Sequence, residues 1–187
     1  IHVLSQSSNI APSFTCIPSD VVGFVTRGPE KGLAFVLSLA RRSPSLTYLI
    51  YGHSRDKPKS LPSNVSWQGW VSDRSAMFAS AALWIVPSLW AEPFGRVSVE
   101  AQAANRAVLV AAHGGLPETV LDPRFQIRGF CADDWLSRMR ELLQLPAKDI
   151  SINGARIREA FSIDVHDCRL LTAVDSITNR SRPHANP

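Results

Sequence analysis

The sequence predicts one α/β domain built on a parallel sheet with helices on both faces. Short apolar runs with a strand-like composition alternate along the chain with segments of helical periodicity. Each run is nearly continuous in apolar residues, as expected of strands that are buried on both sides. The 187 residues, of which 45% are hydrophobic and 19% charged, suffice for one globular core.

Five segments are predicted to be strands. Each is a short apolar run that ends near a glycine, a proline or a polar loop. They are Val21–Val25, 46–52 (LTYLIYG), 65–71 (VSWQGWV), 83–88 (LWIVPS) and 107–112 (AVLVAA).

Helices are predicted between and after these strands from the spacing of apolar residues. Asp73 falls in the first turn of the segment 72–82, where an acid suits the helix dipole. Ser162 is the expected cap of a final helix over 162–177. The other predicted helices are 31–42, 96–104, a short one opened by LPETV, and 133–145. Their clearest apolar faces are Leu33, Val36, Leu37 and Ala40 in 31–42, and Trp135, Leu136, Met139, Leu142 and Leu143 in 133–145.

Composition divides the chain into three parts. Residues 1–20, rich in Ser, Pro and Asn, are predicted to be a linker or arm. Residues 21–160 form the α/β domain, and 161–187 a terminal helix with a disordered tail. The first residue is not methionine, so the chain is expected to be a piece of a longer protein.

Charge and cysteine content argue against several classes of function. The net charge of +4 suits a site for a small anion. No run of Lys and Arg interleaves with aromatic residues, so nucleic acid is not an expected partner. The longest apolar runs, such as AALWIVPSLW, are too short and too interrupted to span a bilayer. Cys16, Cys131 and Cys168 form no metal-binding pattern, so no metal site is expected and the cytoplasm is the predicted location.

The candidate site is expected at the carboxyl ends of the strands, where parallel α/β sheets bind ligands. Three loops reach that edge, with the sequences TRGPEKG, SLWAEPFG and AHGGLPE. In the second loop, Gly95 would let a ligand approach the free backbone N–H groups of the helix 96–104, which suits a phosphate. Glu92 precedes this helix, and Glu100 lies within it, about 7 Å along the helix axis from Gly95.

These two carboxylates could accept hydrogen bonds from hydroxyls at two ends of one elongated ligand. The alternative is that Glu92 and Glu100 are ordinary acidic residues near a helix start. Arg27 and Lys31, in the first loop, could neutralise a diphosphate, Arg by forked hydrogen bonds and Lys as a point charge. The alternative for this pair is a solvated turn.

The remaining candidates are glycines and tryptophans. Gly114 and Gly115 form a tight turn that either admits a ligand close to the backbone or is a plain turn. Trp67, Trp70 and Trp84 are predicted to fill the core, although the loop 70–73 could instead border a base.

The segments VTRGPEKGL, VSWQGWV and LWIVPSLWAEPFGRVSVEAQAANRAVLVAAHGGLPETV resemble the C-terminal half of retaining glycosyltransferases of the group 1 family, which have the GT-B fold. The resemblance covers residues 21–122, and its specific feature is the E-x7-E block followed by the GGLPE turn. It implies a Rossmann-like domain that binds a nucleoside-diphosphate sugar, a UDP- or GDP-sugar, with no cofactor and no essential metal.

The resemblance also implies roles for individual residues. Glu92 would hold hydroxyls of the donor sugar near the reacting carbon, and Glu100 would bind the ribose. Arg27 and Lys31 would clamp the diphosphate and, with Glu92, make up the catalytic set. The other donor-binding positions would be Phe94, Gly95 and Arg96 at the sugar and phosphate, Trp70, Val71 and Asp73 at the base, and Gly114 and Gly115 in the turn.

The implied enzyme is of the hexosyltransferase type and moves a sugar to a hydroxyl acceptor in polysaccharide or glycoconjugate synthesis. It needs an N-terminal acceptor domain or a partner chain outside this sequence, so the isolated chain is expected to be inactive in transfer. The whole protein is expected in the cytoplasm, either free or peripheral to the membrane.

Two positions depart from the family pattern. Thr26 stands where a glycine is usual, in a loop that looks shortened, and Asn105 stands where a helix-ending glycine is usual. Asparagine is the next best residue for a left-handed helix end. Two alternatives remain: a non-catalytic nucleotide-sugar-binding module or subunit of a two-chain enzyme, and a structural domain with a decayed site.

Overall fold

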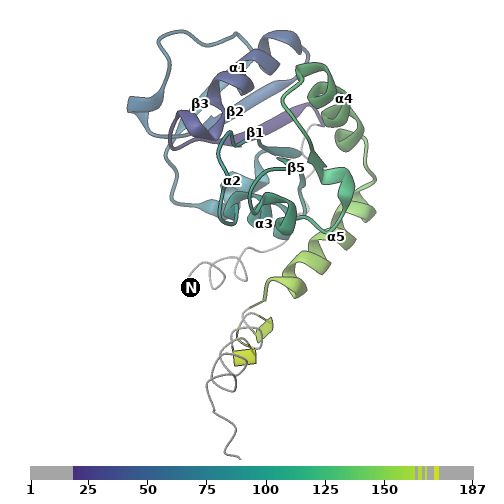
Figure 1. Cartoon of the computed structure of the whole chain (residues 1–187). Helices are drawn as coiled ribbons and strands as arrows, with labels where there is room; N and C mark the ends of the chain where they lie inside the picture. Colours follow the sequence, from purple (N-terminus) through teal and green to yellow (C-terminus); the bar gives the residue numbers. More distant parts are fainter. Residues whose placement is uncertain (1–18, 163, 166, 168–170, 173–187) are drawn as a thin grey trace, which may run out of the picture.

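The computed structural model describes residues 19–162, 164–165, 167 and 171–172 (Figure 1). They form a six-stranded sheet in the order β3-β2-β1-β4-β5-β6, and every neighbouring pair is parallel. The predicted fold class is therefore confirmed. The strands are β1 Val21–Val25, β2 Thr47–Tyr51, β3 Val65–Gly69, β4 Leu83–Val86, β5 Ala107–Ala111 and β6 Gln126–Ile127.

The helices pack in two groups against this sheet. Helix α4 contacts α1 as well as β4 and β5, whereas α3 contacts α5 and the same two strands, so the two groups cover opposite faces (Figure 1). None of the described helices has the length and apolar character needed to cross a membrane. Their bounds are α1 Leu33–Arg42, α2 Arg74–Ala79, α3 Arg96–Ala103, α4 Ala132–Leu143 and α5 Ala147–Ala160.

The five predicted strands are all present; Val21–Val25 has the predicted bounds, and the ends of the other four differ by at most two residues. The additional strand β6 has only two residues, too few to show a period. The predicted helix at 31–42 begins later, at Leu33, because a 3-10 turn over Pro29–Lys31 ends at Gly32. Gly32 has a φ of 88°, and a Cβ there would collide with the carbonyl oxygen of Pro87. A glycine is needed where this turn meets the loop after β4.

Helix α5 is absent from the sequence prediction because Asn153 and Gly154 are poor helix formers at its centre. In the structure, Gly154 lets α5 approach α3 closely, since a Cβ there would collide with Asn105 Oδ1. Arg158 donates a hydrogen bond to the same Asn105 oxygen at 3.0 Å. Asn105 itself has a φ of 57°, which confirms the predicted left-handed helix end.

Several predictions concern the ends of the chain. The arm at 1–20, the helix at 162–177 and the tail lie largely outside the described residues, and so they stay predictions. Ser162 Oγ accepts a hydrogen bond from the Val165 backbone N–H at 3.3 Å, as expected of a capping serine.

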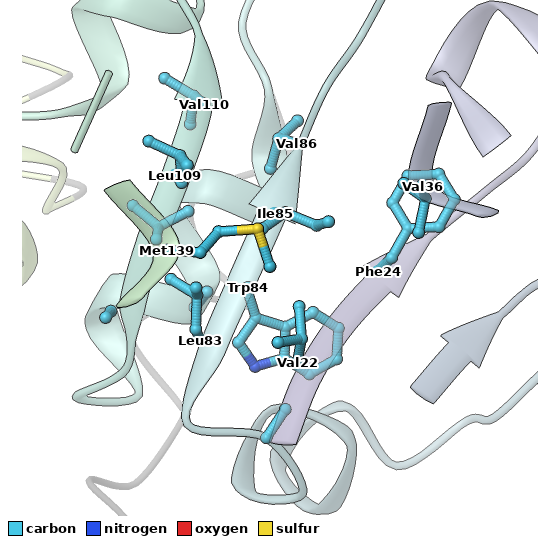
Figure 2. Packing of buried hydrophobic residues seen from close by; sticks show 14 of the residues in the cluster. Val22, Phe24, Val36, Leu83, Trp84, Ile85, Val86, Leu109, Val110 and Met139 are labelled. Carbon is cyan, nitrogen blue, oxygen red and sulfur yellow. The ribbon is translucent and has the colours of Figure 1, made fainter. Parts of the chain in front are cut away.

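Buried apolar side chains fill the space between the sheet and its helices. Figure 2 shows Met139 of α4 reaching from its helix toward Leu109 of β5 and Ile85 of β4. Trp84 of β4 is fully buried, as predicted, and packs beside Phe78 with ring centroids 4.9 Å apart. This packing holds β4 in place, and the loop after β4 carries Glu92.

Gly23 makes room for the Trp84 ring. The two residues are paired in the register between β1 and β4, and a Cβ at Gly23 would lie 2.7 Å from the indole. We expect Gly23→Ala to lower the free energy of unfolding by about 1–3 kcal/mol, because the confined ring cannot move away. Urea unfolding measures this loss. In a Trp84→Phe background the same substitution should cost less, and an equal cost in both backgrounds would contradict the steric explanation.

Candidate functional site

A cavity of about 550 Å³ lies at the carboxyl ends of β1 and β4. These strands are neighbours at the point where the strand order reverses, which is where open parallel sheets bind ligands. Most of the predicted site residues line this cavity. They are Arg27, Lys31, Trp70, Val71, Glu92, Phe94, Gly95 and Arg96.

Main-chain hydrogen bonds join the three loops at this edge of the sheet. The Leu89 N–H in the loop after β4 donates to Glu30 O in the loop after β1 at 2.8 Å. The Gly115 N–H in the loop after β5 donates to Glu92 O at 2.7 Å. Gly114 has a φ of 60°, and a Cβ there would lie 2.6 Å from the Glu92 backbone nitrogen. Gly114 and Gly115 therefore support the backbone of Glu92 and do not line the cavity.

The carboxylate of Glu92 is held by two side chains. Lys31 Nζ lies 2.9 Å from Glu92 Oε1, and the Ser88 hydroxyl donates to the same oxygen. Glu92 is only 8% exposed but still lines the cavity, so these contacts aim its carboxylate. Lys31 Nζ also lies 5.2 Å from the centre of the Trp90 ring. Ser88 was not among the predicted site residues, and its only signal is its place at the end of the predicted strand 83–88.

Arg27 is held against an aromatic side chain. Its guanidinium carbon lies 4.4 Å from the centre of the Trp70 ring, a favourable cation–π distance. His53 also stacks on Trp70, with ring centres 5.1 Å apart and an interplanar angle of 10°. Trp70 is half exposed, so its predicted place in the core is wrong. The alternative, that this loop borders the ligand site, agrees with its place in the cavity wall.

Glu100 lies beside the cavity and not in its wall. It is 2% exposed, and its two oxygens form ion pairs with arginines that do line the cavity. Arg96 NH2 lies 3.4 Å from Oε1, and Arg74 NH2 pairs with Oε2. Arg74 was not among the predicted site residues. The available signal was that the residue after Asp73 opens a helix at the same edge of the sheet.

Asp73 also lies outside the cavity wall. Its Oδ1 accepts a hydrogen bond from the Ala76 backbone N–H at 3.0 Å, so Asp73 is the N-cap of α2 rather than a first-turn residue. This cap fixes where α2 begins, and therefore where Arg74 emerges.

Positive charge dominates the cavity. Arg27, Lys31, Arg74 and Arg96 line it, with Glu92 as the carboxylate in the wall. Burial lowers the pKa of Arg74 below its ordinary value, and the like charges of Arg96 and Arg27 lower it further. An anion bound among these groups would relieve their repulsion.

The start of α3 adds to this positive potential. Gly95 precedes the helix with a φ of 90° and no side-chain cap, and a Cβ there would collide with Leu116. The helix N-terminus carries a partial positive charge and unpaired N–H donors, which suit a phosphate. The arrangement as a whole can bind an elongated anion that also carries hydroxyl groups.

Known proteins resemble this chain in sequence and in architecture. The family model described as "Glycosyl transferases group 1" matches residues 19–144. The D-inositol 3-phosphate glycosyltransferase of Mycobacteroides abscessus is 32% identical over 142 residues, which are 66% of this chain and 32% of that protein. The enzyme of the same name from Mycolicibacterium smegmatis is 30% identical over 166 residues, or 78% of this chain and 38% of that one.

Solved structures of glycosyltransferases and related proteins have a similar fold over most of this chain. Anabaena HepE in complex with UDP and glucose superposes with a TM-score of 0.71 at 23% identity, over 93% of this chain and 52% of HepE. Sucrose-phosphate synthase from Thermosynechococcus elongatus gives 0.70 at 21% identity, over 96% of this chain and 49% of that one. The chain spans about a third of the curated relatives and about half of these structures. The chain therefore belongs to the glycosyl transferases group 1 family and corresponds to the C-terminal half of the GT-B fold.

Proposed function

We propose that this chain is the donor-binding domain of a retaining, metal-independent glycosyltransferase. The enzyme would move a sugar from a nucleoside-diphosphate sugar to a hydroxyl acceptor. The observation that carries this proposal is the cluster of four cationic side chains around the start of α3, in a cavity at the switch point of the sheet. Structures of the similar HepE contain UDP or UDP-glucose, which supports a UDP-sugar as donor.

The diphosphate fits best among Arg27, Lys31 and the N-terminus of α3. Arg27 can bind phosphate oxygens in a forked geometry, while Lys31 adds a point charge. Negative charge builds up on the leaving diphosphate as the bond to the sugar breaks. Cations that are already in place are worth most at that moment, because they need no reorganisation. In this proposal these groups supply the positive charge that the leaving diphosphate needs, so the reaction requires no metal.

The two ends of the donor fall on either side of the diphosphate. Glu92, aimed by Lys31 and Ser88, is placed to accept hydrogen bonds from hydroxyls of the sugar. Trp70 and Val71 form the wall proposed for the base. Glu100 would bind the ribose through Oε1 once the Arg96 side chain turns away from that oxygen, while Arg74 stays paired with Oε2.

The isolated chain is expected to bind a nucleoside diphosphate without transferring a sugar. The cavity proposed for the donor lies within the described residues, but the chain spans only about half of the similar structures. Calorimetric titration with UDP, GDP, ADP and their sugars measures the binding and identifies the base.

Two results would count against this proposal. If none of the diphosphates binds, the cavity is not a donor site. If the purified chain transfers sugar over many turnovers, a second domain is not required. Binding of the nucleotide sugar by the whole protein without any transfer would favour the non-catalytic module instead.

A further inference from the structure

Arg74 enters the cavity from a different element than the other cations. It is the first residue of α2, and Asp73, the N-cap, fixes its backbone. The residues just before it, Trp70, Val71 and Ser72, line the same wall of the cavity. This wall combines an indole ring, an aliphatic side chain and a hydroxyl group, and it ends at a guanidinium. A ligand that contains a flat ring with polar atoms at its edge, such as a nucleotide base, suits such a wall.

Glu100 restrains the guanidinium of Arg74. The carboxylate is 2% exposed, and the side chain of Arg74 is 32% exposed, so the pair lies at the boundary between the core and the cavity. Arg74 contacts Glu100 Oε2 through NH2, whereas a guanidinium carries five N–H donors. An arginine anchored in this way loses little side-chain freedom when it binds a ligand, which favours specific recognition.

We infer that Arg74 is a specificity-determining residue of the proposed donor site, and that it donates hydrogen bonds to the base and favours a base with a carbonyl oxygen at its edge. This inference rests on the proposed function. A guanidinium can only donate, so it pairs with the O4 of uracil or the O6 of guanine. Cytosine and adenine present an amino group at the corresponding positions, and two donors facing each other leave both unpaired.

The test compares bases that differ at this position. The affinities of UDP and CDP, and of GDP and ADP, are measured by calorimetry on the wild-type chain and on Arg74→Met. The wild-type chain should prefer the carbonyl base of at least one pair by about tenfold or more. Arg74→Met should reduce this preference to nearly one. Arg74→Lys should keep part of it, since lysine also only donates.

Arg74→Met also removes a partner of Glu100, so thermal unfolding is recorded for each variant. The readout is the ratio of two affinities within one variant, and this ratio does not depend on how stable the variant is. Arg27→Ala is the matched control. It also removes one cavity-lining arginine, and it should weaken both members of each pair equally, which leaves the ratio unchanged.

Three results would overturn the inference. The wild-type chain could show no preference, Arg74→Met could keep the full preference, or the variant could bind every diphosphate more tightly because Arg74 only blocks the site. A different result would reject the proposed function itself: the wild-type chain would bind none of UDP, CDP, GDP and ADP.

Discussion

In an enzyme that contains this domain, Glu92→Gln is expected to lower kcat by about a hundredfold or more. The neutral amide is a weaker acceptor for sugar hydroxyls, and it cannot stabilise the positive charge that develops on the sugar as the leaving group departs. Affinity for the bare nucleoside diphosphate should be unchanged or higher, because Lys31 loses its ion-pair partner and can turn to the phosphates. Steady-state kinetics and UDP titration measure the two effects separately.

Ser88→Ala provides a control for the Glu92 prediction. It removes the hydroxyl that donates to Glu92 Oε1 but leaves the carboxylate and its contact with Lys31 in place. Its kcat should therefore fall much less than that of Glu92→Gln. Equal losses of nucleoside diphosphate affinity in both variants, with kcat little changed, would place Glu92 at the phosphates instead of the sugar.

Arg27→Ala should weaken binding of the nucleoside diphosphate by about tenfold to a hundredfold, the range expected for a lost charge-assisted hydrogen bond. Binding of the uncharged nucleoside should hardly change, because Arg27 is proposed to act on the diphosphate alone. Arg27→Lys should restore only part of the affinity, since an ammonium cannot make a forked contact. Added salt should weaken the wild-type complex more than the Arg27→Ala complex, because screening reduces the contribution of each charge.

Arg55→Ala is the matched control for Arg27→Ala. The Arg55 side chain is 80% exposed and lies outside the cavity wall, so its loss changes the net charge equally without touching the proposed site. If both variants lose the same affinity, the effect is one of overall charge. If Arg27→Ala keeps the full preference for the diphosphate over the nucleoside, the start of α3 and Arg96 become the leading candidates for the clamp.

Sequence alone predicted the parts of the fold that depend on local pattern. Strands β1 to β5 were found because each is an apolar run of several residues, and Gly95 and Glu100 were placed correctly on either side of the helix start. Helix α5 was missed because its central Asn153 and Gly154 serve its packing against α3, a distant element. Propensity cannot reveal a glycine that is required by a neighbour elsewhere in the chain.

In the candidate site, too, residues placed by local sequence pattern were predicted, and contacts between distant residues were not. Arg27, Lys31 and Glu92 lie in loops whose positions follow from the strand pattern, and the structure brings them into one cavity. The pairing of Arg74 with Glu100 could not be predicted, because the two residues belong to different helices and meet only in the folded domain. Trp70 was assigned to the core on residue type alone, and only the structure shows that half of it is exposed.

The main-chain hydrogen bonds between the loops bear on how this site can evolve. Glu30 and Leu89 are joined through their backbones, as are Glu92 and Gly115, so these links do not depend on the side chains of Glu30, Leu89 and Glu92. Substitutions in these loops can therefore change the proposed ligand site while the main-chain hydrogen bonds still hold the loops together. The exceptions are Gly32, Gly114 and Gly115, where any added side-chain atom would strike the backbone of the loop after β4. A saturation library over this rim should tolerate replacement at most positions and lose folded protein at those three glycines.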